Sequence, residues 1–218
     1  MKFIVITFYL SYLISVFFNL ELDVFIKPLL MPLLLIYVSL QAKVFRNSLV
    51  ITALFFSTIG DSLLIFEGNL FFIGGLGAFL IAQICYIVIF FKGINLTHKT
   101  SFKIVPALLL IAYLIAILSL LIPNIENSLL VPVFCYAITI SMMLYFAIHW
   151  RIDNPQITTK YVVIGAGLFV ISDSLLAISK FKNEFTNDHF LVMLTYLLAQ
   201  FLIISGLTTK LKKVKKPR

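Results

Sequence analysis

Eight apolar segments, each long enough to cross a lipid bilayer, dominate this chain of 218 residues. A transmembrane helix needs about 20 apolar residues to span a hydrocarbon core of roughly 30 Å. The segments that meet this requirement lie near residues 3–20, 24–41, 49–66, 70–91, 103–122, 128–149, 161–180 and 188–209. Because 61% of the residues are hydrophobic and 12% are charged, the composition excludes a soluble globular domain. The sequence predicts an all-α fold, a polytopic membrane protein of eight transmembrane helices forming a single domain over 1–218.

The distribution of basic residues predicts the orientation of these helices. If the chain starts in the cytoplasm and crosses eight times, 14 Lys and Arg residues fall on the cytoplasmic side, and Lys27, Lys180 and Lys182 fall on the other. Such an excess of positive charge marks the cytoplasmic side of a membrane protein. We therefore expect both termini to be cytoplasmic, including a basic tail over 210–218, and we expect a multi-pass location in the cytoplasmic membrane of a bacterium.

Several other classes of function find no support in the sequence. The net charge of +8 follows from topology, and no nucleic-acid-binding motif accompanies it, so we expect no nucleic-acid partner. The histidines, His98, His149 and His189, are scattered along the chain and predict no metal site. Cys85 and Cys135 both lie in predicted spans, where we expect small packing residues rather than a disulfide. No cofactor is indicated, and the oligomeric state is not predicted.

Two aspartates, Asp61 and Asp173, lie inside the third and seventh apolar segments, where an ionisable residue is costly and usually functional. Each begins the same four-residue sequence, Asp-Ser-Leu-Leu. A second match follows in the next segment, where Leu-Ile-Ala-Gln ends at Gln83 and Leu-Leu-Ala-Gln ends at Gln200. The matches predict an internal duplication into two parallel four-helix repeats, related by an axis along the membrane normal.

The two repeats, over about 1–100 and 103–209, should place Asp61 and Asp173 opposite each other across a shared cavity. Helical rise puts both acids roughly 8–10 Å below the outer boundary, so the cavity should open toward the outer leaflet. Two carboxyl groups sharing a low-dielectric site do not both ionise readily, so we expect one to hold its proton while the other is charged. The alternative is that each acid only bonds backbone or neighbouring hydroxyl groups, such as that of Ser62, to fix helix packing.

Two further pairs of polar residues are candidates to line this cavity. Gln83 and Tyr86 lie three residues apart, and Tyr196 and Gln200 lie four apart, so each pair shares a helix face. The two glutamines should lie about 10 Å deeper than the aspartates. Hydrogen bonding between helices is the alternative function for these residues.

Lys27 and Lys180 are candidates to bind a phosphate group. Both lie at the predicted outer level of the aspartates, and Lys180 follows Asp173 by seven residues, on the same helix face. Lys27 precedes Pro28, expected at the start of a helix, whose free N–H groups would add donors for an anion. The alternative is that both side chains reach outward to the membrane surface.

Taken together, these residues resemble the YhhN family of lysoplasmalogenases. The resemblance covers essentially the whole chain and is carried by Lys27-Pro28-Leu29, Gly60-Asp61, Gly77-Ala78-Phe79-Leu80 with Gln83 and Tyr86, Ser172-Asp173 with Lys180-Phe181, and Tyr196 with Ala199-Gln200. It implies an eight-span enzyme of membrane lipid metabolism that hydrolyses the vinyl ether bond of a lysophospholipid. The products would be a fatty aldehyde and glycerophosphoethanolamine or glycerophosphocholine. It also implies that Asp61 and Asp173 are the catalytic pair. Gln83 stands where we expect His in many relatives, and Gln cannot pass a proton at neutral pH.

The chemistry of the implied substrate agrees with a pair of acids. A vinyl ether hydrolyses when its β-carbon is protonated and water captures the resulting oxocarbenium ion, much as in glycosidases, where one carboxylic acid protonates and a second carboxylate stabilises the cation. We assign Asp61 and Asp173 these roles without choosing between them. A proton-coupled transporter of small solutes or lipids is the main alternative. An intramembrane aspartyl protease is less favoured because its Gly-x-Gly-Asp motif is missing, with Thr58-Ile59-Gly60-Asp61 in its place.

Overall fold

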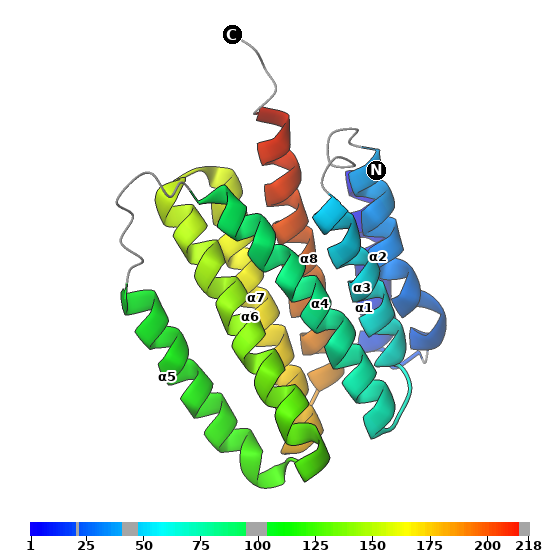
Figure 1. Ribbon diagram of the computed structural model, residues 1–218. Coiled ribbons are helices and arrows are strands. Elements are labelled where there is room, and N and C mark those ends of the chain that lie inside the picture. Colours follow the sequence, from blue (N-terminus) through cyan, green and yellow to red (C-terminus); the bar gives the residue numbers. More distant parts are fainter. Residues whose placement is uncertain (21, 41–47, 95–103, 214–218) are drawn as a thin grey trace.

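The computed structural model describes residues 1–20, 22–40, 48–94 and 104–213 (Figure 1). Over these residues the chain forms eight α-helices and one short 3₁₀ helix, and no strand. The helices are α1 (Lys2–Phe17), α2 (Asp23–Ser39), α3 (Ser48–Leu63), α4 (Asn69–Gly93), α5 (Ile104–Leu121), η1 (Ile122–Asn124), α6 (Asn127–Asp153), α7 (Ile157–Phe181) and α8 (Asp188–Lys213). The predicted all-α fold is confirmed, and each α-helix overlaps one of the eight predicted segments.

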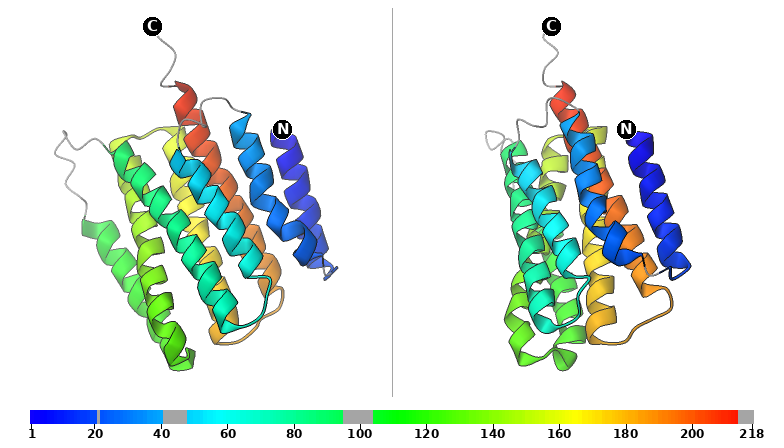
Figure 2. Two further views of the ribbon diagram at one scale, coloured as in Figure 1. Left: turned by 45° about the vertical axis from the view of Figure 1, so that its right-hand side comes forward. Right: turned by 90° about the vertical axis from the view of Figure 1, so that its right-hand side faces the viewer.

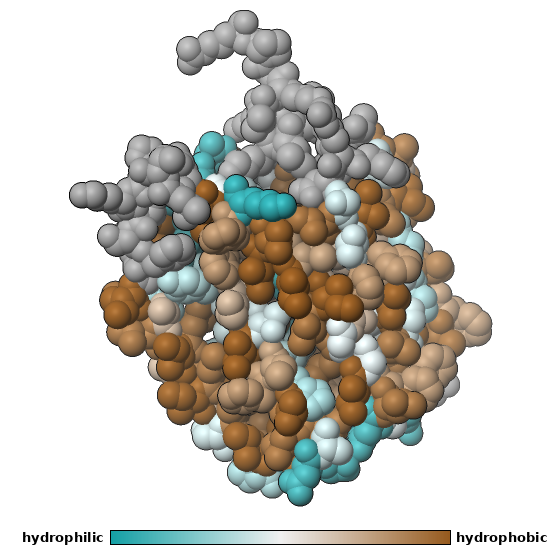
Figure 3. Space-filling view, viewed as in Figure 1, coloured by the Kyte–Doolittle hydropathy of each residue, from teal (hydrophilic) through white to brown (hydrophobic). Residues whose placement is uncertain are grey.

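The surface and the helix lengths identify an integral membrane protein. Helices α4 to α8 are long and apolar enough to cross a membrane, and α1, α2 and α3 are shorter apolar helices. In the face shown in Figure 3, apolar residues cover the middle and hydrophilic ones gather toward the two ends of the bundle. A helix of 16 residues, such as α1 or α3, is roughly 24 Å long, less than the hydrocarbon core. The count of eight crossings therefore stays a prediction.

The helices form one bundle with a peripheral helix on each side. Helix α3 packs along α4, and α7 packs along α8, while α4 also packs on α6. Helix α1 lies at one edge against α2 and α8, and α5 lies at the other edge against α6 and α7 (Figures 1 and 2). Side-chain hydrogen bonds join α4 and α6 near both ends, from Asn69 Nδ2 to Glu126 Oε2 at 2.7 Å and from Asn154 Nδ2 to the Gly93 carbonyl at 3.1 Å.

The start of α1 and the last turn of α8 lie at the same end of the bundle, and the α3–α4 and α7–α8 connections lie at the other end (Figure 1). Which end faces the cytoplasm stays a prediction. Several basic residues on which it depends lie outside the described residues, as does His98: Lys43, Arg46, Lys99, Lys103, Lys215, Lys216 and Arg218. Of the predicted tail over 210–218, residues 210–213 continue α8, and the rest lies outside the description.

Three local predictions are wrong. Helix α2 begins at Asp23, so Pro28 lies inside the helix and the N-terminal N–H donors lie a turn away from Lys27. Helix α3 ends at Leu63, so Asp61 is in its last turn, about 3 Å of helical rise from the helix end rather than the predicted 8–10 Å. Cys135 is exposed on α6, whereas Cys85 is buried as expected; both cysteines are free.

Gly165 sets the close approach of α7 to α8, and its replacement gives a test of this packing. A Cβ atom on Gly165 would lie 2.8 Å from the Ala199 carbonyl oxygen and 2.9 Å from the Ile203 backbone nitrogen, whereas a Cβ on Gly167 would meet nothing within 4 Å. We expect Gly165→Ala to destabilise the protein by about 1–3 kcal/mol because backbone atoms cannot yield like a side chain. Gly167→Ala is the matched control and should leave the melting temperature in detergent unchanged or raised. Equal melting temperatures for the two variants would contradict this account of the α7–α8 contact.

Candidate active site

A polar cavity opens at the end of the bundle that carries the α3–α4 and α7–α8 connections. It has a volume of about 1420 Å³ including its open mouth. Its polar and charged lining residues come from α2, α3, α7, α8 and the two connections: Lys27, Asp61, Glu67, Ser172, Asp173, Ser179, Lys180, Glu184, Asp188, His189 and Tyr196. The structure thus brings five of the predicted site residues, Lys27, Asp61, Asp173, Lys180 and Tyr196, to one cavity.

Asp61 lies at the inner wall of this cavity and is 2% exposed. The Tyr196 hydroxyl on α8 donates a hydrogen bond of 2.9 Å to Asp61 Oδ2. The preceding Gly60 leaves room for the ring of Phe79, since a Cβ on Gly60 would lie 2.6 Å from that ring. The Gly-Asp sequence therefore lets an aromatic ring of α4 pack directly beside the acid. Lys27 is close enough to Asp61 to interact with it electrostatically.

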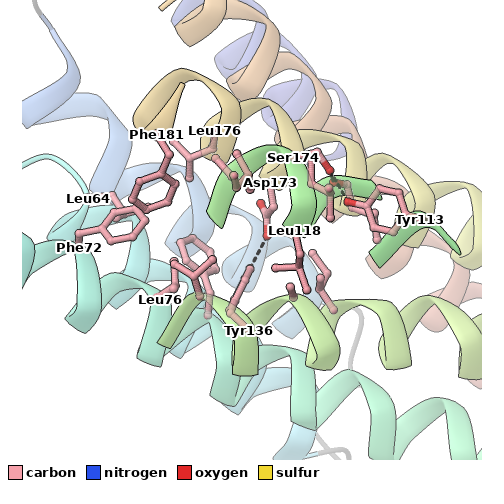
Figure 4. Close-up of a pocket in the computed structure, with 18 residues that line it drawn as sticks. Leu64, Phe72, Leu76, Tyr113, Leu118, Tyr136, Asp173, Ser174, Leu176 and Phe181 are labelled. Carbon is pink, nitrogen blue, oxygen red and sulfur yellow. Dashed lines mark hydrogen bonds between the residues drawn. The ribbon is translucent and has the colours of Figure 1, made fainter. Parts of the chain in front are cut away.

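Asp173 lies where the polar cavity meets a second, mostly apolar pocket (Figure 4). The Tyr136 hydroxyl on α6 donates a hydrogen bond to Asp173 Oδ2. Asp173 is partly exposed, unlike Asp61. The two acids therefore share a cavity and each accepts a tyrosine hydrogen bond, but their surroundings differ.

The hydroxyl groups next to the aspartates have other partners. Ser62 donates to the Thr58 carbonyl at 2.8 Å, and Ser174 donates to the Val170 carbonyl at 2.5 Å. Ser172 donates to the Val192 carbonyl on α8 at 3.0 Å. These serines donate to the backbone of a helix. The bonds that the acids accept come instead from tyrosines of neighbouring helices, so a packing role for the acids stays an alternative.

The remaining predicted polar residues form a buried layer below the cavity. The Tyr86 hydroxyl donates to Gln200 Oε1 at 2.7 Å, and Gln200 Nε2 donates to Ser57 Oγ at 3.0 Å, so α4, α8 and α3 are joined. Gln83 is fully buried close to Tyr136, and neither its amide oxygen nor its amide nitrogen has a hydrogen-bond partner among the described residues. Neither glutamine nor Tyr86 is among the residues lining the polar cavity, so their binding of substrate stays a prediction.

The two lysines of the cavity differ in exposure. Lys27 is 9% exposed, whereas Lys180 is exposed, with its Nζ 5.6 Å from the centre of the Phe72 ring. Lys182 is exposed and is not among the residues lining the cavity. A buried ammonium group can bind an anionic group strongly, because little water screens the attraction between them.

Sequence reasoning missed several residues of the site. Tyr136 could not be identified from the sequence, because the predicted first repeat has no tyrosine that matches it. His189, noted in the sequence only as one of three scattered histidines, lies in the first turn of α8 and lines the cavity with Glu67 and Glu184. Within the described residues, no three His, Cys, Asp or Glu side chains gather closely enough to hold a metal ion.

The two tyrosine donors give a direct test of the site. We expect Tyr136→Phe and Tyr196→Phe each to lower kcat/KM by about 10-fold or more, since a hydrogen bond to a charged group contributes about 1.5–3 kcal/mol. The control is Tyr161→Phe, because Tyr161 is 39% exposed on α7 and does not line the cavity. Purified variants should keep wild-type melting temperatures while their activity is measured. A loss of activity in the control as large as in the two variants would contradict a specific effect.

These features define a class of protein: an integral membrane helical bundle with paired acids in a polar cavity that continues into an apolar pocket. The YhhN family model matches residues 22–207, and the chain belongs to this family. It is similar to "Lysoplasmalogenase TMEM86B" from Homo sapiens, with 31% identity over 164 residues that cover 74% of this chain and 64% of the human protein. The protein of the same name from Mus musculus is 30% identical over 154 residues, which cover 70% of this chain and 60% of the mouse protein. The chain thus spans less than two thirds of each relative. No solved structure matches it.

Proposed function

We propose that this protein is a lysoplasmalogenase, a membrane enzyme that hydrolyses the vinyl ether bond of a lysophospholipid. The products are a fatty aldehyde and glycerophosphoethanolamine or glycerophosphocholine. The observation that carries the proposal is the position of the two acids: Asp61 and Asp173 line one polar cavity, and Asp173 also lines the apolar pocket. Membership of the family and its similarity to the mammalian lysoplasmalogenases support the same activity.

Asp173 is the proposed proton donor. The vinyl ether joins the polar glycerol to the apolar chain, so its reactive β-carbon belongs at the boundary where Asp173 lies. Proton transfer from the Asp173 carboxyl group to this carbon leaves an oxocarbenium ion and an Asp173 carboxylate. Tyr136, which donates to Asp173 Oδ2, would hold the carboxyl group in position and stabilise the carboxylate.

Asp61 is the proposed stabiliser of the cation. As a carboxylate in the same cavity, it would favour the oxocarbenium ion electrostatically and direct a water molecule to the cationic carbon. Addition of water, with loss of one proton to a carboxylate, gives a hemiacetal. The carbon–oxygen bond to glycerol then breaks as the hemiacetal hydroxyl gives up its proton, the glycerol oxygen takes up one proton in exchange, and the aldehyde is released. The reaction consumes one water and needs no cofactor.

Lys27 and Lys180 are the proposed phosphate-binding residues. Both line the polar cavity with the aspartates, and Lys27 is nearly buried beside Asp61. The phosphate of a lysophospholipid is separated from the vinyl ether by the glycerol alone, so one cavity can contact both groups. Tyr196 lines the same cavity, while Gln83, Tyr86 and Gln200 would act from the layer below by positioning the tyrosines and helices.

The topology and the duplication belong to the same proposal. We place the enzyme in the cytoplasmic membrane of a bacterium with both ends of the chain cytoplasmic. Two four-helix repeats, over about 1–100 and 103–209, are supported by the matched acids and glutamines. They are also supported by the matched arrangement of the α3–α4 and α7–α8 pairs and by the peripheral positions of α1 and α5.

The test is aldehyde release by the purified protein from a lysoplasmalogen, carried out in D₂O with the aldehyde reduced at once to the alcohol. Protonation at the β-carbon predicts one deuterium at the second carbon of the product. The control substrate is the saturated alkyl ether lysophospholipid, which has no vinyl group and should not react. If no aldehyde is released, and proteoliposomes instead take up a solute with protons, the protein is a transporter.

A further inference from the structure

The apolar pocket that meets the polar cavity at Asp173 has a wall made of a single helix. We call it the apolar cleft; it lies between α5 on one side and α4, α6 and α7 on the other (Figure 4). Its volume is about 690 Å³ when the open space at its mouth is included, and its interior is narrow. The cleft therefore suits a thin group such as a single hydrocarbon chain.

Helix α5 separates this cleft from the membrane. Within α5 only Leu121 is buried, and Ile104, Leu109 and Ile115 are 65–68% exposed. Its cleft face carries Tyr113, Ile117, Leu118 and Leu121, whose spacing places them on one side of a helix. The outer face of α5 is thus an apolar, lipid-facing surface, and its inner face lines the cleft.

The polar groups of the cleft form hydrogen bonds with one another and lie close to Asp173. Ser174 donates to the Val170 carbonyl, so the Tyr113 hydroxyl, 2.5 Å from Ser174 Oγ, is the donor in the bond between them. This bond ties α5 to α7 one residue from Asp173. Asp173 in turn accepts from Tyr136. The rest of the cleft is lined by aliphatic and aromatic side chains, which suit a hydrocarbon.

The cleft and the polar cavity are continuous. They share Asp173 and the apolar residues Leu64, Phe72, Phe79 and Leu176. A molecule lying across this boundary would have its charged part among the lysines and its apolar part beneath α5. A lipid with one hydrocarbon chain has this distribution, whereas a protein segment or a second copy of the chain would not also fill the polar cavity.

We propose that the apolar cleft beneath α5 binds the hydrocarbon chain of a single-chain lipid, with α5 as the wall between the bound chain and the membrane. The inference rests on the proposed function for the identity of the lipid, an alkenyl lysophospholipid. Beyond that function, the cleft is the place where the hydrocarbon chain lies. The residues that line it, first among them Ile117, determine which chain lengths the protein prefers.

The variant that tests the site is Ile117→Trp, which fills part of the cleft from a peripheral helix and leaves both aspartates in the sequence. Its matched control is Ile115→Trp, because Ile115 lies on the same helix and is 65% exposed on the lipid-facing side. With a series of alkenyl chain lengths, Ile117→Trp should lower kcat/KM for long chains by about 10-fold, the effect of keeping two methylene groups out of an apolar site. Short chains should be affected little, and the control should behave as wild type.

A second measurement needs no substitution and no turnover. A saturated alkyl ether lysophospholipid with a diazirine in the middle of its chain is photolysed with the wild-type protein, and labelled peptides are identified by mass spectrometry. We expect labelling of the α5 segment 113–121 and the α6 segment 133–140. Labelling confined to other helices, with equal chain-length profiles for the two tryptophan variants, would overturn the inference. Labelling of the cleft without any aldehyde release by the wild type would support the chain site and refute the proposed reaction.

Discussion

Asp173→Asn should lower kcat/KM for a lysoplasmalogen by about 10²–10⁴-fold, the range expected for the loss of a general acid. Asparagine has nearly the same shape as aspartate but cannot donate a proton to carbon. Asp61→Asn should also cause a large loss, since the oxocarbenium ion would form beside a neutral amide. Aldehyde release by purified variants measures both effects, and unchanged melting temperatures show that the bundle is intact.

A matched control for these variants is Asp153→Asn. Asp153 ends α6 at the opposite end of the bundle, so its replacement removes the same charge without touching the cavity. The double variant adds information, because two groups acting in one step give a combined loss close to that of the more severe single variant. Wild-type turnover in both single variants would rule out the two-aspartate mechanism.

The acids were predictable because a charged residue inside an apolar helix is costly and a repeated one is rarely accidental. The sequence placed Asp61 and Asp173 in equivalent helices, and the duplication predicted a shared cavity. The structure lines one cavity with both. Lys27 and Lys180 were found for a related reason, since they depart from the predicted distribution of positive charge.

The tyrosine donors were less predictable because they do not follow the repeat. Asp61 accepts from Tyr196 on α8, whereas Asp173 accepts from Tyr136 on α6, and these two helices are not equivalent in the duplication. Tyr196 was noticed through its spacing from Gln200, but Tyr136 had no polar neighbour at helical spacing to mark it. The predicted duplication matches the two acids, whereas packing between helices that it does not match gives them different environments. Different environments suit the two different roles proposed for them.

The sequence also did not predict where some helices end or which of their faces are buried. The apolar segment containing Asp61 continues past Leu63, so hydropathy did not show that α3 ends there. Helix α5 is apolar on nearly every side, with one hydroxyl residue, Tyr113, on the face of Ile117 and another, Ser119, on the face of Ile115, so hydropathy did not show which face lines the cleft. Only its packing against α6 and α7 shows which residues line the cleft.

Lys27→Met should raise KM for a lysoplasmalogen by about 30-fold or more, since removing one partner of a buried, hydrogen-bonded charge pair costs about 2–5 kcal/mol. Lys27 is 9% exposed in the polar cavity, so its ammonium would meet the phosphate with little screening by water. Lys27→Arg should restore part of the affinity because it keeps the charge. Lys180→Met should have a smaller effect because Lys180 is exposed.

The kinetic constants separate two functions for Lys27. If it binds phosphate, KM rises in Lys27→Met, and the inhibition constant of a saturated alkyl ether lysophospholipid rises with it. If it acts only on Asp61, kcat falls and the inhibition constant stays the same. The matched control is Lys182→Met, which removes an exposed lysine that does not line the cavity and should leave both constants unchanged. Because the cavity holds Lys27 and Asp61 together, we expect kcat to fall as well, by less than KM rises.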